Sequence, residues 1–153
     1  MWKRLIIIFI AFAIVGSIML LFSNYAKDNF KEKLYKDYEK TTLEQISTLE
    51  QTLKSNPDEP TTYYYLSLAY WHIDKIDLAE NYIQLGIKKF PENTSLKLLL
   101  GEYYVGLNKI NKARELYKEL KGSNSLDAEE LSKAIKDPSK VPPRGRKNIL
   151  FPD

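Results

Sequence analysis

Two stretches of the sequence repeat one another: "YLSLAYWHIDKIDLAENYIQLGIKKFP" at residues 65–91 and "LLGEYYVGLNKINKARELYKELKGSNS" at residues 99–125. Leu66 matches Leu100 at an offset of 34 residues, and the connector "IDKID" returns as "LNKIN". The other pairs with this offset are Ser67 and Gly101, Tyr70 and Tyr104, Ile76 and Ile110, and Ala79 and Ala113. One offset shared by this many positions in a chain of 153 residues indicates internal structural repeats.

The period and the residue types resemble the tetratricopeptide repeat (TPR) family, whose pattern spaces an aromatic, Leu-Gly, Tyr, Ala, a second aromatic and Pro. The resemblance covers about residues 57–125, with repeats at about 60–93 and 94–127. Lys97 and Ser125 depart from the pattern, which has an aromatic residue and a proline there. The resemblance implies an all-α solenoid of helical hairpins. The residues implied to pack between repeat helices are Tyr63, Leu66, Ser67, Tyr70, Ala79, Ile83, Leu100, Gly101, Tyr104, Ala113 and Tyr117.

The segments between and beside the repeats carry their own signals. Asp74 and Asn108 stand at the predicted tight turns, where a left-handed backbone is expected and Asp and Asn tolerate it best after Gly. Two repeats bury little surface alone, because such stacks generally need three units or caps. We therefore expect a helix at 41–55, starting at the capping-box spacing of "TTLEQ", to pack before the first repeat. "SLDAEELSKAI", with Asp127 and Glu130 in cap positions, should close the other end as a short helix.

The N-terminal segment "MWKRLIIIFIAFAIVGSIMLLFSNY" is uncharged from Leu5 to Phe22. As a helix this run extends roughly 27 Å, close to the hydrocarbon thickness of a bilayer. It predicts an uncleaved single-span transmembrane anchor; a cleaved signal peptide, whose apolar region is normally shorter, is the alternative. Lys3 and Arg4 favour a cytoplasmic N-terminus. The prediction is thus a single-pass cell-membrane protein whose repeat domain is extracytoplasmic.

The remaining organisation follows from charge and composition. The interleaved charges of residues 27–40 predict a solvated helix or stalk. The predicted order is an anchor at 1–25, a stalk and pre-repeat helices at 26–56, repeats with a capping helix at 57–136, and a basic, proline-rich, disordered tail at 137–153. The formal net charge of +3 is weak ground for a nucleic-acid partner. The tail is either merely solvated or contacts anionic lipid or cell-wall polymer through Arg144, Arg146 and Lys147.

The sequence offers little for catalysis. Cysteine is absent, which excludes disulfides, a thiolate zinc site and a cysteine nucleophile. His72 is the single histidine, so neither a metal site nor a catalytic triad has a second histidine to use, and a polar residue at a helix end is the better interpretation. No glycine-rich phosphate loop, GxSxG elbow or HExxH motif is present. We expect a protein that is not an enzyme and uses no metal or cofactor.

The TPR resemblance implies a concave groove, lined by the first helix of each repeat. Its implied residues are Thr61, Tyr64, Leu68, Trp71, His72, Ser95, Leu98, Glu102, Val105 and Gly106. Their mostly apolar and aromatic character suits an extended or helical peptide with large apolar anchors. The family's two-carboxylate clamp needs Lys, Asn and Arg, and these are absent because its positions hold Tyr64, Tyr65, Leu68, Leu98, Leu99 and Glu102.

Two questions stay open at this point. The groove is either free for a partner or covered within the same chain by the 41–55 helix or the C-terminal tail. The predicted function is a membrane-anchored scaffold or adaptor that holds a protein or peptide partner in the groove. The alternative is an obligate structural subunit whose repeats pack permanently against other chains of a membrane complex.

Overall fold

The computed structural model describes residues 2–123, 126–142 and 144, and the backbone alone for residues 3–13. These residues form six α-helices and one 3-10 turn, with no strand among them, so the predicted all-α class is confirmed for this part of the chain. The helices are α1 (Trp2–Ser55), α2 (Pro60–His72), α3 (Ile76–Lys89), α4 (Thr94–Gly106), α5 (Ile110–Gly122) and α6 (Leu126–Lys136), followed by η1 (Pro138–Lys140). Met1–Lys40 and Thr41–Asp153 form two separate units.

Helix α1 runs without interruption through the site where the sequence predicts a new helix. Thr42 is buried and does not cap a helix start. Further along, the hydroxyls of Thr48 and Thr52 donate to carbonyls four residues earlier, at 3.1 and 3.0 Å, which is a helix-interior arrangement. No proline interrupts the chain before Pro57. The predicted separate helix at 41–55 is therefore wrong, because these residues are the last turns of α1.

The apolar part of α1 does not meet the requirement for a membrane span. Its large side chains between Ile14 and Phe22 are exposed, and the charged stretch begins at Lys27. A bilayer crossing needs about 20 consecutive, predominantly apolar residues. Among the residues that the structure describes, no helix combines that length with that apolar character. The predicted anchor at 1–25, and the single-pass cell-membrane localisation that rested on it, are therefore wrong.

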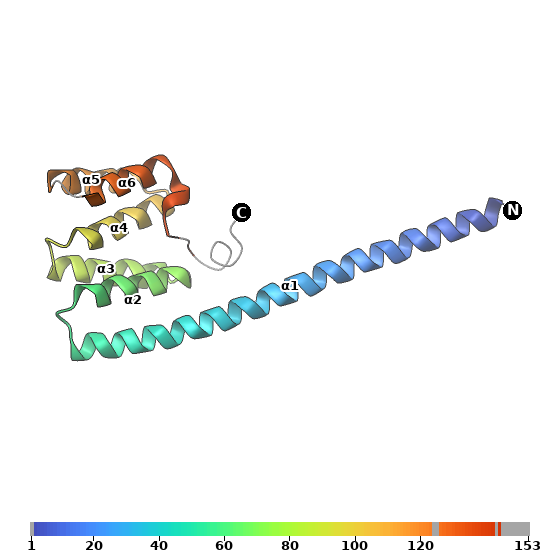
Figure 1. The fold of residues 1–153 in the computed structure, drawn as a ribbon, viewed down its shortest axis with the longest axis horizontal. Helices are drawn as coiled ribbons and strands as arrows, with labels where there is room; N and C mark the ends of the chain where they lie inside the picture. The colour runs from blue at the N-terminus through green and yellow to red at the C-terminus, as the bar shows by residue number, and fades with distance from the viewer. Residues whose placement is uncertain (1, 124–125, 143, 145–153) are drawn as a thin grey trace. The chain divides into compact units, whose positions relative to one another are not determined.

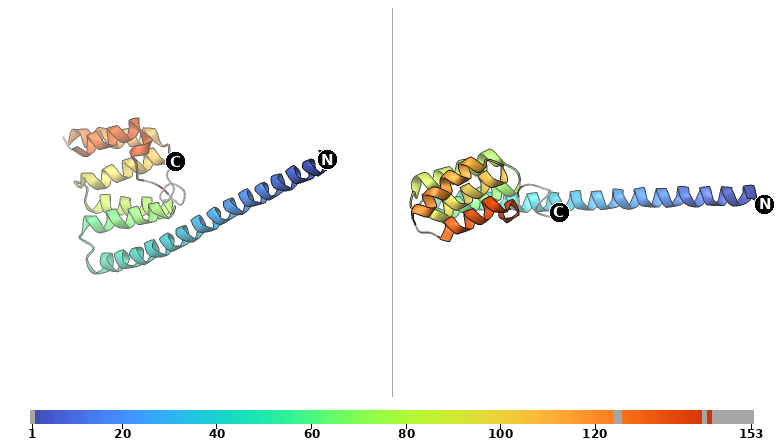
Figure 2. Two further views of the ribbon diagram at one scale, coloured as in Figure 1. Left: turned by 45° about the vertical axis from the view of Figure 1, so that its right-hand side comes forward. Right: turned by 90° about the horizontal axis from the view of Figure 1, so that it is seen from above.

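The unit from Thr41 onward contains two helical hairpins in the same register. Helices α2 and α3 form the first hairpin, and α4 and α5 form the second. The first helices begin at residues 60 and 94 and the second helices at residues 76 and 110, an offset of 34 in both cases. Asp74 and Asn108 have φ angles of 61° and 57°, which confirms the predicted left-handed turns. After each, a backbone N–H returns to the last helical turn, from Lys75 to the Tyr70 carbonyl (2.9 Å) and from Lys109 to that of Tyr104 (2.7 Å). Figure 1 shows the first hairpin, then α4, then α5 and α6 at one level, and Figure 2 shows the same helices from two further directions.

The interior of this stack holds nearly all residues that the TPR resemblance assigns to packing. Those buried are Tyr63, Leu66, Ser67, Tyr70, Ala79, Ile83, Leu100, Gly101, Tyr104 and Ala113, whereas Tyr117 is half-buried. Ser67 donates a hydrogen bond to the Ala79 carbonyl (2.7 Å), and a 3.1 Å hydrogen bond joins its hydroxyl to that of Tyr103. A single buried hydroxyl thus ties α2 to both α3 and α4.

Helix α6 closes the far end of the stack, as predicted. It packs on α4 and α5, and Asp127 lies in its first turn. A Cβ on Gly101 would lie 2.6 Å from a Leu131 methyl carbon, so this helix can approach α4 because Gly101 has no side chain. The sequence predicts close approach between the two helices of one hairpin here. The atoms nearest Gly101 belong instead to the capping helix.

The last turns of α1 pack on the first hairpin, which confirms the expected support before the first repeat. Ile46 is buried in the common core, with Leu49 and Leu53 against it. Glu50 accepts hydrogen bonds from the hydroxyls of Tyr70 (2.8 Å) and Tyr82 (3.1 Å), whose rings stack at 5.5 Å. A carboxylate at the interface therefore joins α1 to both helices of the hairpin.

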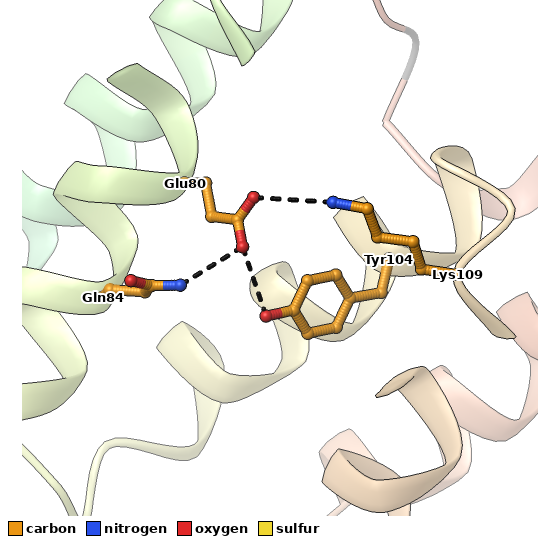
Figure 3. Close-up of polar contacts among 4 residues, drawn as sticks. All are labelled: Glu80, Gln84, Tyr104 and Lys109. Atoms are coloured by element: carbon orange, nitrogen blue, oxygen red, sulfur yellow. Dashed lines mark hydrogen bonds and ion pairs between the residues drawn. The ribbon is translucent and has the colours of Figure 1, made fainter. Parts of the chain in front are cut away.

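The equivalent tyrosine of the second hairpin has a different partner. Tyr104 donates to Glu80 of α3 at 3.3 Å, and Glu80 also contacts Gln84 and Lys109 (Figure 3). Both tyrosines thus end on a carboxylate from the preceding helix, although the two glutamates are not at equivalent positions. This network joins α3 to the second hairpin.

The beginning of the C-terminal tail is folded, which corrects the prediction of disorder there. Pro138–Lys140 form the 3-10 turn η1, and the side chain of Asp137 accepts hydrogen bonds from the Ser139 N–H (3.1 Å) and hydroxyl (2.7 Å). Arg146 and Lys147, assigned with Arg144 to contacts with anionic lipid or polymer, lie outside the described residues.

Candidate functional site

The structure divides the predicted groove residues by burial. Trp71 and Val105 are buried, whereas Gly106, Thr61 and Ser95 are exposed. The half-buried residues are Tyr64, Leu68, His72, Leu98 and Glu102. The set therefore does not form one open surface, and its members lie in different surroundings.

Leu68 and His72 line a cleft of about 570 Å³ between the last turns of α1 and helix α2. Tyr65, also on α2, lines it and remains 56% exposed. The full lining is Thr41, Thr42, Glu44, Gln45, Thr48, Leu49, Tyr65, Leu68, Ala69 and His72. Burial lowers the pKa of His72, so its imidazole is held neutral at physiological pH. The lining of the cleft is thus mainly apolar and neutral polar, and Glu44 is its acidic residue.

Tyr64 lies in a smaller cavity of about 230 Å³ between the first turns of α2 and α4. Its lining is Pro60, Thr61, Tyr64, Tyr65, Asn93, Ser95 and Leu96. The rings of Tyr64 and Tyr65 meet edge to face with 5.4 Å between centroids. Because Tyr65 lines both cavities, it separates the predicted groove residues of the first hairpin into two groups.

Glu102 is the titratable residue of the set with the most altered surroundings. Burial, followed by the negative charges of Glu130 and Asp127 on α6, raises its pKa to about 7. Burial, followed by the charges of Glu102, Tyr65 and Asp127, also raises the pKa of Tyr64. A half-protonated carboxylic acid can exchange a proton near neutral pH. No histidine or metal ligand set accompanies it: among the described residues, no three His, Cys, Asp or Glu side chains gather as a metal site would require.

Trp71 contacts the chain's own C-terminal segment. Its ring stacks on Tyr103 with 4.1 Å between centroids and 6° between planes, and its indole N–H donates to the Pro142 carbonyl at 3.0 Å. A Cβ on Gly106 would lie 2.9 Å from the indole, so only glycine leaves room for this ring. The sequence leaves open whether the tail covers the groove, and at Trp71 the structure shows that it does.

Sequence reasoning missed the residues that α1 contributes to the cleft, chiefly Thr41, Gln45 and Thr48. The apolar stripe of Ile46 and Leu49 predicts that these turns pack on the first repeat, but not which polar neighbours face the cavity. The signal was available, because a helix packed through one stripe presents the adjoining positions along the edge of the contact.

Comparisons with known proteins do not extend these observations: no protein-family model, no curated protein and no solved structure matches the chain. The features of this chain that bear on its function are the repeat period, the two hairpins in register and the cleft beside α2.

Proposed function

We propose that the chain is a protein-binding scaffold of the tetratricopeptide-repeat type, which holds a peptide segment of a partner against the first repeat. The cleft between α1 and α2 carries the proposal. Its volume of about 570 Å³ is within the usual range for binding sites and suits one or two large side chains of a peptide. The 34-residue register of the hairpins supports the family assignment.

The lining favours a peptide with apolar anchors. Leu49, Leu68 and Ala69 provide apolar surface, and Tyr65 offers an exposed ring that can cover a bound side chain. On the opposite wall Gln45 supplies a side-chain amide, and the Thr48 hydroxyl, which donates to the Glu44 carbonyl, retains acceptor capacity for a peptide N–H. An apolar floor with a few polar groups is the usual composition of a site that recognises a peptide by its side chains.

The test uses site-directed photo-crosslinking in the full chain. A photoreactive phenylalanine derivative replaces Tyr65, and in a matched control it replaces Leu85, an exposed apolar residue of α3 that does not line the cleft. We expect a discrete crosslinked partner from position 65 and not from position 85, with loss of the product when Thr48→Arg fills the cleft. Equal products from both positions, or a product unaffected by Thr48→Arg, would contradict the proposal.

A second candidate function is an obligate subunit of a multi-chain assembly, and a different observation favours it. Helix α1 exposes a run of large apolar side chains at Ile14, Val15, Ile18, Met19, Leu20, Leu21 and Phe22. Exposed apolar surface of this extent is typical of an interaction site. Analytical ultracentrifugation tests this candidate by measuring the mass of the species that contains the chain after isolation from its native source. A stable monomer would exclude an obligate subunit.

A further inference from the structure

The segment that follows α6 returns to the first hairpin and lies on Trp71. Val141 is half-buried against the core, and the next residue, Pro142, accepts the indole hydrogen bond through its backbone carbonyl. Arg144 places its guanidinium 5.7 Å from the centre of the Trp71 ring, with its Nε 3.4 Å from an Asp74 carboxylate oxygen. Val141, Pro142 and Arg144 thus supply an apolar contact, a carbonyl and a cation, in that order.

The direction of this segment is set before it reaches Trp71. The 3-10 turn after α6 is held by Asp137, whose carbonyl accepts from the Lys140 N–H at 3.0 Å and whose side chain caps the turn through Ser139. Val141 then has extended backbone angles, φ −76° and ψ 155°. A folded turn followed by a residue with polyproline II backbone angles directs the segment toward the hairpin as an extended ligand.

The contacts are those that an extended peptide makes in a recognition groove. An aromatic wall with an N–H donor selects a proline-containing segment by packing and by one hydrogen bond to a backbone carbonyl. A carboxylate beside the aromatic ring selects arginine, which can stack and pair at once. Gly106 leaves the space beside the indole, and its Cβ position lies 3.6 Å from a Val141 methyl carbon. Trp71 and Gly106 are both positions that the TPR resemblance assigns to the groove.

We propose that Val141, Pro142 and Arg144 act as an intramolecular ligand, and that the Trp71 site recognises an extended segment with the same spacing, apolar–Pro–x–Arg, in a partner protein. The inference rests on the proposed scaffold function. It adds the Trp71 site to the cleft as a second binding site and assigns a class of ligand to it. The chain's own segment is tethered to the end of α6, a few residues before Val141. Its effective concentration at the Trp71 site is therefore in the millimolar range. A partner segment therefore has to displace it, and binding at this site is autoinhibited until the tail is released.

The tail contact is tested first, through the fluorescence of Trp71. The full-length variant Trp2→Phe retains Trp71 as its single tryptophan. In this background the release variant Val141→Ser/Arg144→Ser removes two of the three contacts, and Arg114→Ser, at an exposed arginine of α5, is the charge-matched control. We expect acrylamide quenching of Trp71 to rise severalfold, with red-shifted emission, in the release variant and to stay unchanged in the control.

Peptide recognition is tested next with a fluorescent peptide of residues 139–147, SKVPPRGRK. By anisotropy, the release variant should bind it at least ten times more tightly than the chain with its own tail in place, and binding should reverse the increase in quenching. The control peptide SKSPPSGRK should not bind. Should circular dichroism show that the release variant is unfolded, Asp74→Asn removes the partner of Arg144 while retaining a residue that tolerates the left-handed turn.

Three outcomes would overturn the proposal. Equal quenching in the release variant, the Asp74→Asn variant and the parent would show that the tail does not cover Trp71. An exposed Trp71 that binds no peptide would show that the site is not a recognition site. Quenching that rises on dilution of the parent would show that the covering segment belongs to a second copy. In each case crosslinking from Tyr65 reports separately on the cleft, so failure here is distinguishable from failure of the scaffold function.

Discussion

The two hairpins share a backbone but differ in what covers the first helix of each. At positions 34 residues apart, Leu68 of α2 lines an open cleft, whereas Glu102 of α4 is half-buried near acidic residues of α6. The same offset pairs Ser67, which bonds to α3 and α4, with Gly101, which admits Leu131. The comparison teaches that the repeat pattern sets the hairpin, whereas the equivalent positions at which the two repeats carry different residues decide whether its face stays open.

The largest difference is expected at the pair Trp71 and Val105. Trp71 is fully buried and stacks on Tyr103, so Trp71→Ala should lower the free energy of unfolding by about 3–5 kcal/mol. Val105→Ala removes two buried carbons and should cost about 1–2 kcal/mol. Urea denaturation followed by far-ultraviolet circular dichroism measures both.

The same measurement separates folding from binding at Trp71. Because Trp71→Ala is expected to weaken the whole domain, lost partner binding in this variant would not identify a binding residue. Equal losses of stability in Trp71→Ala and Val105→Ala would show that the indole is not part of the core, and would contradict the observed stacking on Tyr103.

The second difference is expected where the hairpins exchange serine for glycine. Gly101→Ser gives the second repeat the residue of the first, and its Cβ would meet Leu131 at 2.6 Å. Overpacking of this kind costs about 1–3 kcal/mol. The double variant Gly101→Ser/Leu131→Ala should lose less stability than the sum of the single losses, because the smaller side chain removes the clash. Additive losses in thermal melts would show that α6 does not pack on Gly101.

Much of the fold was predictable from the 34-residue register. The register predicts the two hairpins and the left-handed turns at Asp74 and Asn108, because hairpins and turns depend on residues close in sequence. The segments before and after the repeats predict that the end of α1 packs on the first hairpin and that a capping helix follows the second. The uncharged run near the N-terminus predicts a membrane anchor, and the structure does not support this prediction.

The candidate site was less predictable, for a physical reason. Trp71 meets Pro142 across 71 residues of sequence, and no local pattern specifies such a contact. The cleft depends on which side of α1 faces α2, which follows from packing and not from the repeat pattern. Of the predicted groove residues, Leu68 and His72 share the cleft, whereas their assignment to partner binding stays a prediction.

The third difference concerns the pH dependence of stability and is expected at the equivalent positions Leu68 and Glu102. The raised pKa of Glu102, about 7, means that the folded chain binds a proton that the unfolded chain releases near pH 4.5. Stability is therefore lost as pH rises from about 4.5 to 7, and the loss is complete above that. Glu102→Gln should stabilise the chain by about 1–2 kcal/mol at pH 8, after allowance for partial exposure, and by little at pH 4.

Urea titrations at the two pH values check this prediction, with Glu129→Gln as the matched control because Glu129 is an exposed acid of α6. A stabilisation by Glu102→Gln that is the same at pH 4 and pH 8 would indicate a packing effect and not a titration. A Glu129→Gln variant that reproduces the pH dependence would assign it to the general charge of α6.

The smallest expected effect compares the two left-handed turns and isolates the tail contact. Asn108→Gly relieves a positive φ angle and should stabilise the chain by roughly 0.5 kcal/mol. Asp74→Gly relieves the same conformation but also removes the partner of Arg144, an exposed ion pair worth about 0–1 kcal/mol, so its net effect should be near zero. The difference between the two variants should shrink in 1 M salt, because salt screens exposed pairs. A salt-independent difference in melting temperature would mean that Asp74 supports its turn in some way other than by holding the C-terminal segment.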